Sequence, residues 1–545
     1  MPTTPISVTA TPHRALGRSL RHCPICSSAD LRYEFIVDGY PVCRCAQCSL
    51  LFLNPQPART TNQIDPSNPE QMNSSVYELH AANAASRLDQ LMTYARAKPH
   101  RVLMIANDAF LTREARERQL DVVSLTSNEV DQGAIGALPQ GLFDAVVFYC
   151  TLERLSDPEA VLKDLKRRLI PSGVVMVIGP TIDSRTARLF RSAWWEFHPQ
   201  NLHYFSADTL QSLLLKCGYG DPIIDSDDCA VSLEYFKRKI PGVSSGFYRR
   251  VLSLLVWATP GFLRHRAFRS LNSRRIVLAR SKPVAEVPTL SVIVAAYNEK
   301  ETLRTLMDRL IAKSIDGVNI EIILVESNSS DGTREDAQRY SGHPRVRFVP
   351  EDRPRGKGHA VRTGLAACTG DVVLFQDADL EYDIDDYDDL IAPLLAYRRN
   401  FVIGSRHVSK GRVWKIRQFN DAVPLATVFN FGHVFFLALF NFMYRQRLKD
   451  PFSMFKVFRR DCLHGLAFEC NRFDFDFEIV IKLLRKGYRP LELPVNYRAR
   501  SPREGKKVKM FRDPLTWIRA LLKFRWSPLY TSDGTTQNAS AAGQE

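Results

Sequence analysis

Short apolar strands alternate with helical segments over most of this chain, and that alternation restricts its fold more than any other feature. In residues 77–280 the pattern predicts strands at Val102–Ala106, Asp121–Leu125, Asp144–Phe148 and Val174–Ile178, with helices such as Asp157–Leu169 between them. A second series begins at Leu290, with further strands at 320–325, 346–349 and 372–376. Such alternation is typical of a parallel sheet covered by helices on both faces. The sequence therefore predicts an α/β fold with two doubly wound, Rossmann-like domains.

Length and composition divide the chain further. At 545 residues it is too long for one hydrophobic core. Residues 281–288, with Pro283 and Pro288, read as a linker. The predicted organisation is a disordered N-terminus (1–20), a zinc ribbon (21–56), a first α/β domain (75–280), a linker (281–288), a second α/β domain (289–526) and a disordered tail (531–545).

Four cysteines near the N-terminus have the spacing of a metal site. Cys23 and Cys26 form one CxxC pair, and Cys45 and Cys48 form a second pair after a gap of eighteen residues. Two such pairs place four thiolates around a tetrahedral zinc ion and leave no position open for chemistry. Cys43 lies between the two pairs, and the other cysteines are scattered along the chain. This distribution is typical of a protein in a reducing compartment. We expect a structural zinc ribbon in a cytoplasmic protein.

The net charge of +15 is concentrated near the C-terminus. Residues 498–525 contain ten Lys or Arg against two acidic residues. Such a stretch could meet nucleic acid, anionic lipid or a phosphorylated substrate. The uncharged segment 422–444 is interrupted by polar residues, so we predict either an amphipathic element at a membrane interface or a buried core helix. No secretory signal is apparent.

A run of acidic residues follows the fourth strand of the second series. Asp377, Asp379 and Glu381 alternate along the chain, and alternate residues of an extended backbone project to the same side. Carboxylates are the ligands of hard divalent cations, which complete their shell with water and phosphate oxygens. We therefore predict a Mg²⁺ or Mn²⁺ site that holds a nucleotide diphosphate.

Five segments of the first α/β domain form a recognisable pattern: Phe143–Val147, Leu155–Pro158, Leu169–Gly173, His203–Ser206 and Cys217–Tyr219. In these segments the domain resembles class I S-adenosylmethionine-dependent methyltransferases. In that family a glycine-rich turn follows the first strand, and an acidic residue ends the second strand. Here residues 106–110 contain no glycine, and the second strand ends at Thr126. The fold is expected, whereas S-adenosylmethionine binding is doubtful.

Eight motifs follow one another in the second α/β domain: Val294–Glu299, Val325–Thr333, Arg355–Ala360, Asp377–Glu381, Gly404–Arg406, Asp450–Phe452, Arg472–Glu478 and Glu504–Lys507. With these motifs in this order, the domain resembles family 2 glycosyltransferases of the GT-A fold, in the branch that glycosylates polyprenyl (dolichol) phosphate. Each motif alone is weak, but their order over more than 230 residues is specific.

The resemblance implies a role for each motif. The nucleotide would lie against Ala295, Tyr297, Glu299 and Glu326, and its phosphates against Arg355, Gly356 and Lys357. Asp377, Asp379 and Glu381 would hold the metal ion, with Asp377 also next to the nucleotide and Asp379 catalytic. Arg406 would bind phosphate oxygens. If the acceptor is a hydroxyl, Asp450 or Asp476 is the expected general base.

These features together predict an inverting, metal-dependent glycosyltransferase that moves a hexose from a UDP- or GDP-linked sugar to a polyprenyl phosphate. We expect it to act at the inner face of the cell membrane, as a peripheral protein. Two alternatives stay open: transfer to hydroxyl acceptors during surface polysaccharide synthesis, and a bifunctional methyltransferase and glycosyltransferase. A nucleic-acid partner is not expected, because no reading module is recognisable.

Overall fold

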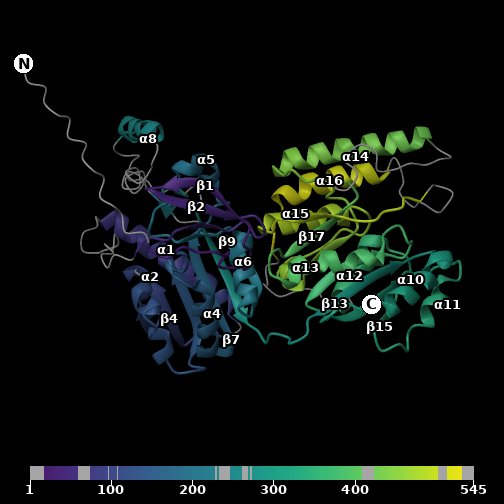
Figure 1. Ribbon diagram of the computed structural model, residues 1–545, viewed down its shortest axis with the longest axis horizontal. Helices are drawn as coiled ribbons and strands as arrows, with labels where there is room; N and C mark the ends of the chain where they lie inside the picture. Colours follow the sequence, from purple (N-terminus) through teal and green to yellow (C-terminus); the bar gives the residue numbers. More distant parts are fainter. Residues whose placement is uncertain are drawn as a thin grey trace, which may run out of the picture.

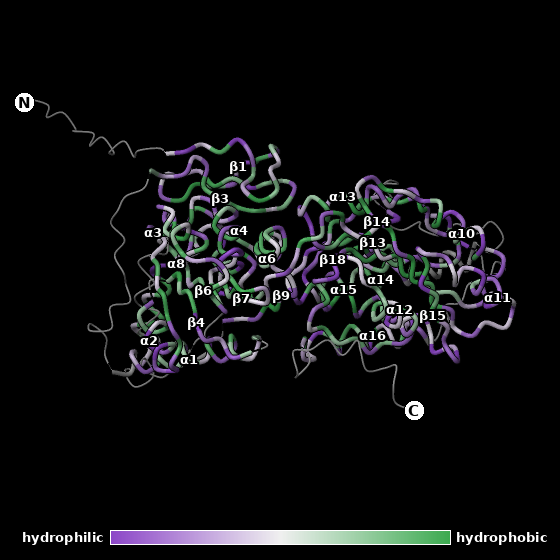
Figure 2. The backbone as a smooth tube through the Cα atoms, turned by 90° about the horizontal axis from the view of Figure 1, so that it is seen from below, coloured by the Kyte–Doolittle hydropathy of each residue, from purple (hydrophilic) through white to green (hydrophobic). Residues whose placement is uncertain are grey.

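The computed structural model describes residues 17–58, 74–95, 97–106, 108–227, 230–231, 246–260, 268–269, 273–407, 423–500 and 512–530. The predicted disordered ends, 1–20 and 531–545, lie outside these ranges except for residues 17–20. Two α/β units lie side by side, one from the N-terminal half and one from the C-terminal half of the chain (Figure 1). Hydrophobic segments gather around the strands of both units, and the peripheral loops are mostly hydrophilic (Figure 2).

The N-terminal cysteine segment forms a small antiparallel sheet. Its strands, in spatial order, are β1 (Leu31–Val37), β2 (Tyr40–Cys45), β3 (Leu51–Leu53) and β8 (His203–Tyr204). The last strand comes from the following unit. Cys23 and Cys45 also belong to the same hydrophobic cluster as Leu103 of that unit. The ribbon is therefore built onto the first α/β unit.

A six-stranded sheet forms the first α/β unit. Its order is β5 (Asp121–Leu125), β4 (Arg101–Ala106), β6 (Phe143–Tyr149), β7 (Leu169–Pro180), β12 (Arg274–Ser281) and β9 (Tyr219–Ser226). The first four strands are parallel, and β12 is antiparallel to both of its neighbours. The predicted α/β fold is confirmed.

Alternate residues of β4 explain why helices cover both faces of this sheet. Leu103 and Ile105 belong to a core that also contains residues of α4 (Pro158–Arg168) and α6 (Ala207–Lys216). Val102 and Met104 belong to a second core, with residues of α1 (Ser74–Tyr94) and α2 (Ala109–Glu117). Because successive side chains of a strand point to opposite faces, a continuous apolar strand must be buried on both.

A seven-stranded sheet forms the second α/β unit. Its order is β15 (Val346–Pro350), β14 (Asn319–Glu326), β13 (Thr289–Ala296), β16 (Val372–Asp377), β18 (Lys456–Arg459), β17 (Phe401–Ser405) and β19 (Leu491–Pro494). The strands from β15 to β16 are parallel, and β18 is antiparallel to β16 and β17. Helices α10 (Lys300–Ala312), α11 (Thr333–Gln338), α12 (Lys357–Ala367), α13 (Tyr387–Leu395), α14 (Val423–Tyr444), α15 (Phe475–Arg485) and α16 (Arg512–Trp526) accompany it.

Polar contacts join the two units. Lys282 Nζ lies 2.6 Å from Asp221 Oδ1 and 2.8 Å from Asp461 Oδ1, which belong to different units. The Tyr530 hydroxyl accepts a bond from the Ile224 amide (2.9 Å) and donates one to the Ile224 carbonyl (2.6 Å), on the edge strand β9. The segment predicted as a linker therefore begins inside an interface, with Ser281 still in β12.

Helix α14 coincides with the long uncharged segment. Phe436 and Phe440 are buried against the second core, whereas Phe431 and Phe442 are largely exposed. One face of the helix is therefore part of the core, while contact of the other face with a membrane interface stays a prediction. Within the part of the chain that is described, no helix is both long and apolar enough to cross a membrane.

Candidate active site of the second unit

Three neighbouring strands bring the predicted nucleotide residues to one edge of the sheet. Ala295 of β13 pairs with Asp377 of β16, and Ala296 pairs with Glu326 of β14. The carboxyl ends of parallel strands meet at the same edge, where ligands of doubly wound sheets bind. Tyr297, partly exposed, follows β13 directly at this edge. The sequence order of the motifs therefore becomes a spatial cluster.

The acidic run is a turn rather than the end of an extended strand. Strand β16 ends at Asp377, and Leu380 has a φ of +58°, in the left-handed region. The expectation that strand alternation aligns the three carboxylates is therefore wrong. Burial and the charges of Asp377 and Glu381 raise the pKa of Asp379 to about 7, even though an arginine lies beside it. The three carboxylates are close enough for their charges to repel one another, although a turn and not an extended strand brings them together.

Arg500 occupies the space between three of the acids. Its guanidinium donates to Asp379 Oδ2 at 2.7 Å and to the two oxygens of Glu299 at 2.8 and 3.2 Å. Its Nε is 3.8 Å from Glu381 Oε1. Glu381 also accepts bonds from the Arg500 amide (2.8 Å) and the Tyr497 hydroxyl (3.0 Å). A guanidinium held by three carboxylates is a stand-in for a bound cation, so this donor set fits a hard divalent ion.

The same geometry limits how the acids can be used. In the described residues, two groups of three or more metal-binding side chains have all their ligand atoms within 4.8 Å of one another, and the acidic turn is not one of them. Asp377 accepts a bond from Lys357 Nζ at 2.8 Å. Binding of a metal ion by Asp379 and Glu381 therefore requires Arg500 to move away. The sequence gives no sign of this contact, because 121 residues separate Arg500 from Asp379.

The predicted phosphate loop has a packing role as well. Gly356 has a φ of +109°, and a Cβ there would lie 2.4 Å from the Asn471 carbonyl oxygen. A Cβ on Gly358 would lie 2.7 Å from the Cys470 carbonyl oxygen. Both glycines are therefore needed for close approach of residues 470–475. Arg355 pairs with Asp352 at the surface, at 3.0 Å.

Glu326 faces inward and does not line the open edge. It is fully buried, and its carboxylate accepts bonds from the amides of Ser329 (2.7 Å) and Asn328 (3.2 Å) and from Arg334 Nε. These bonds fix the turn after β14. A direct contact between Glu326 and a nucleobase or ribose would have to replace them, so the structure favours a positioning role.

Arg406 and Asp450 form a buried, bidentate pair. Arg406 Nη2 and Nε donate to the two oxygens of Asp450 at 2.7 and 2.8 Å, and the Arg406 amide donates at 2.9 Å. Burial alone would raise the pKa of Asp450, but the Arg406 guanidinium holds it well below the usual range. An ionised carboxylate with three strong donors is a poor proton acceptor. Asp450 is therefore better suited to orient Arg406 than to act as a general base.

Two histidines link this pair to α14. His407 Nε2 lies 3.3 Å from His433 Nε2, and both rings are buried near Asp450. The ligand atoms of these three residues lie within 4.8 Å of one another. However, both Asp450 oxygens are bonded to Arg406, whose positive charge opposes a metal ion. We therefore regard the cluster as a polar link between the site and the helix.

Asp476, the other predicted base, lies at the start of α15. It accepts a bond from the fully buried Lys456 Nζ at 3.0 Å. It is also close enough to Asp377 to contribute to the raised pKa of that carboxyl, after burial as the main cause. The structure thus places Asp476 beside the acidic turn. The motif at 504–507 lies outside the described residues.

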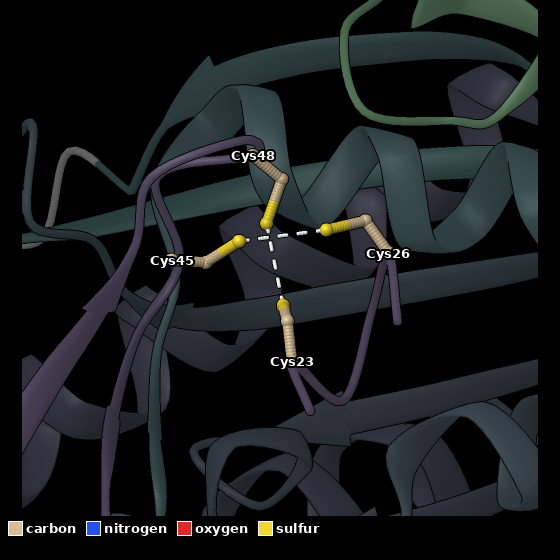
Figure 3. A group of neighbouring side chains, drawn as sticks. All are labelled: Cys23, Cys26, Cys45 and Cys48. Carbon is tan, nitrogen blue, oxygen red and sulfur yellow. Dashed lines mark hydrogen bonds between the residues drawn. The ribbon is translucent and has the colours of Figure 1, made fainter. Parts of the chain in front are cut away.

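The four N-terminal cysteines meet as the spacing predicts. Cys23 Sγ lies 3.4 Å from Cys48 Sγ, and Cys26 Sγ lies 3.5 Å from Cys45 Sγ (Figure 3). A tetrahedral zinc ion with bonds of about 2.3 Å separates its sulfur ligands by about 3.8 Å. The cluster therefore fits a zinc ion with little adjustment.

At the carboxyl end of the first sheet, the side chains expected near a cofactor are bonded to the protein itself. Asp108 Oδ1 accepts bonds from the amides of Phe110 (2.9 Å) and Leu111 (3.1 Å), which caps α2. Thr126, where the family has an acid, caps the short helix α3 (Ser127–Asp131) in a capping box with Glu129. The two positions that would bind S-adenosylmethionine are used by neighbouring backbone. The residues present therefore do not fit S-adenosylmethionine in the way that is usual in the methyltransferase family.

Parts of the two units match the models of two different protein families. Residues 291–465 match the family described as Glycosyl transferase family 2. The chain therefore contains a glycosyl transferase family 2 domain. Residues 50–220 match the family described as Methyltransferase domain.

Two relatives resemble the second unit in sequence. A dolichol-phosphate mannosyltransferase of Pyrococcus furiosus is 30% identical over 241 residues, 43% of this chain and 64% of the relative. A dolichyl-phosphate beta-glucosyltransferase of Drosophila melanogaster is 33% identical over 210 residues, 35% of this chain and 61% of the relative. The chain thus spans less than two thirds of the length of either.

Part of the chain is also similar to solved structures. One is glucosyl-3-phosphoglycerate synthase from Mycobacterium tuberculosis in complex with Mn²⁺, uridine diphosphate and glucosyl-3-phosphoglycerate. It is 25% identical, covers 44% of this chain and 81% of that protein, and has a TM-score of 0.32.

Proposed function

We propose that the chain is a metal-dependent, inverting glycosyltransferase that moves a hexose from a nucleotide diphosphate sugar to a polyprenyl phosphate at the cytoplasmic face of a membrane. The observation that carries this proposal is the cation pocket formed by Asp379, Glu381 and Glu299 at the carboxyl end of the sheet. The names of the two dolichol-phosphate relatives support the choice of acceptor.

The pocket supplies what departure of a nucleoside diphosphate needs. A divalent ion bound there would neutralise the charge that develops on the leaving diphosphate. Asp379 and Glu381 would hold this ion once Arg500 has left them. Lys357 keeps Asp377 oriented by a 2.8 Å bond and adds a positive charge next to the phosphates. Arg500, once released, is close enough to pair with a phosphate oxygen.

The state of the candidate bases favours a phosphate acceptor. A sugar hydroxyl must lose a proton during transfer, whereas a phosphate monoester, with a second pKa near about 6, arrives largely ionised. Asp450 is held by Arg406 through three bonds, and Asp476 is held by Lys456. Neither carboxylate is free to accept a proton in this arrangement. Arg406, whose neighbour His407 lies 3.3 Å from His433 of helix α14, would guide a lipid-linked phosphate.

Substitution of the candidate base separates the two acceptor classes. Asp476→Asn should leave transfer to polyprenyl phosphate within a few fold of the original rate, because no base is needed. For a hydroxyl acceptor the same change should lower kcat by about 10²-fold or more. The rates are compared on labelled UDP- and GDP-sugars with each acceptor, and thermal unfolding checks that the variant is folded.

The cysteine cluster is proposed to hold one structural zinc ion. Four thiolates saturate the ion, so its role is to connect Cys23–Cys26 to the sheet that ends at β8. Native mass spectrometry should show one zinc per chain, and Cys45→Ser should remove it. Retention of full zinc content by that variant would contradict the assignment.

A further inference from the structure

Helix α8 (Gly246–Ala258) of the first unit has apolar side chains both on the side that packs against the unit and on the side that is exposed. Tyr248, Leu252 and Val256, spaced four residues apart, form its inner face. The Tyr248 ring lies 5.4 Å from that of Phe190, in a small aromatic cluster with Trp194 and Trp195. This packing fixes which side of the helix faces outward.

The outer side of α8 is also apolar. We call the residues Phe247, Val251, Leu254, Leu255 and Trp257 the α8 face. Four of them are 60% exposed or more, with Trp257 at 75%. Leu189 of the adjacent α5 (Arg185–Phe190) is 57% exposed. Single exposed apolar residues are common in soluble proteins, but a contiguous aromatic and aliphatic group of this size marks an interaction surface.

The charge around the α8 face is strongly positive. Arg249 and Arg250 of the helix are exposed, as are Arg185 and Arg191 next to it. Helix α8 itself contains no acidic residue. Aromatic and aliphatic side chains surrounded by arginines are the composition of helices that lie in the headgroup region of anionic bilayers.

A second exposed apolar surface lies on the other unit. Phe431, Phe435 and Phe442 of α14 point outward, and so do Leu515 and Trp526 of α16. Helices α8 and α14 lie along the same side of the molecule, at its upper edge in Figure 1. The contacts of Tyr530 and Lys282 across the interface hold the two units in a fixed relation. One flat surface could therefore touch both helices.

We propose that the α8 face binds an anionic lipid bilayer and forms, with α14 and α16, a two-point membrane contact. The first unit would then act as a docking arm that orients the carboxyl edge of the second sheet toward the lipid. The α8 face lies in a different unit from the proposed transfer site. Vesicle binding therefore tests it independently of catalysis.

The test is co-sedimentation of the full chain with vesicles. Vesicles of phosphatidylcholine with about a third phosphatidylglycerol are compared with vesicles of phosphatidylcholine alone. The double variant Leu254→Glu/Trp257→Ser should bind the anionic vesicles at least about tenfold more weakly than the original chain. Val284→Glu, which changes an exposed apolar residue between the units, is the matched control and should bind normally.

A second variant separates charge from packing. Arg249→Glu/Arg250→Glu leaves the inner face of α8 intact and should abolish the preference for anionic vesicles. Unchanged vesicle binding by both double variants would overturn the proposal. So would a dimer in light scattering that dissociates in the Leu254→Glu/Trp257→Ser variant, because the α8 face would then bind a second copy of the chain.

Discussion

The carboxyl ends of the two sheets use their polar residues in opposite ways. In the second unit, Asp379, Glu381 and Glu299 surround the side chain of Arg500. In the first unit, Asp108 and Thr126 are bonded to the backbone of the helices that follow them. Two sheets of the same architecture thus differ in whether these residues contact a charged side chain or backbone amides.

A buried charge pair also lies at the carboxyl end of the first sheet. Arg87 donates twice to Asp227 at 2.9 Å, and its guanidinium lies 4.8 Å from the centre of the Tyr149 ring at the end of β6. A buried, fully bonded pair is costly to break. The end of β6 is therefore covered by a bonded charge pair.

The comparison predicts its largest effect for Asp379→Asn. The substitution removes a charge from the cation pocket, so glycosyl transfer should fall by roughly 100-fold or more. Initial rates with saturating Mn²⁺ measure the loss. Asp385→Asn, an exposed acid a few residues on, should change little. Equal activity of Asp379→Asn and the original chain would remove the pocket from the mechanism.

A smaller effect is expected from removing the competing cation. Arg500→Ala eliminates charged hydrogen bonds worth about 1.5–3 kcal/mol each, so Mn²⁺ should bind about tenfold more tightly or better. Titration calorimetry or electron paramagnetic resonance gives the dissociation constant. Arg498→Ala, whose side chain is exposed, is the control. Weaker Mn²⁺ binding by Arg500→Ala would show that the arginine organises the acids and does not compete for them.

In the first unit an acid should matter only for stability. Asp108→Ala removes the cap of α2 and should cost about 1 kcal/mol, seen as a fall in Tm of a few degrees, with no change in glycosyl transfer. Glu78→Ala, on the exposed side of α1, should leave Tm unchanged. A loss of activity without a loss of stability would give this edge a functional role that its geometry does not indicate.

The smallest effect is expected for S-adenosylmethionine, for which calorimetry should detect no binding. Titration of the full chain with S-adenosylmethionine to millimolar concentration should release no heat, because Asp108 and Thr126 are engaged. A saturable heat of binding would support the bifunctional methyltransferase and glycosyltransferase. It would also show that the difference between the carboxyl ends of the two sheets does not decide whether they bind a ligand.

The sequence predicts the strands of both sheets and the edge at which the site lies. Apolar runs such as 102–105 and 372–375 are strands because their residues are buried in the cores of the two units. The motif order predicts that Asp377 and Glu326 lie near Ala295, since parallel strands share an edge. These inferences depend on local periodicity, which a sequence shows directly.

What the sequence misses are the partners of the charged groups. The pairing of Arg500 with Asp379, or of Lys282 with Asp461, joins residues more than a hundred positions apart. The left-handed Leu380 that ends strand alternation carries no signal in its side chain. The sequence also does not show that the outer face of α8 is exposed. Its apolar residues are equally typical of a buried core, and only the packing of Tyr248, Leu252 and Val256 shows which side of the helix faces inward.

The most direct test of the central claim is the fate of the transferred sugar. The full chain is incubated with Mn²⁺, labelled UDP- and GDP-sugars and vesicles that contain polyprenyl phosphate, with a soluble glycan as the competing acceptor. Our account predicts label in the organic phase as a polyprenyl-phosphate sugar, lost in Asp379→Asn and retained in Asp385→Asn. Label found in the soluble glycan alone, with every donor tried, would contradict it.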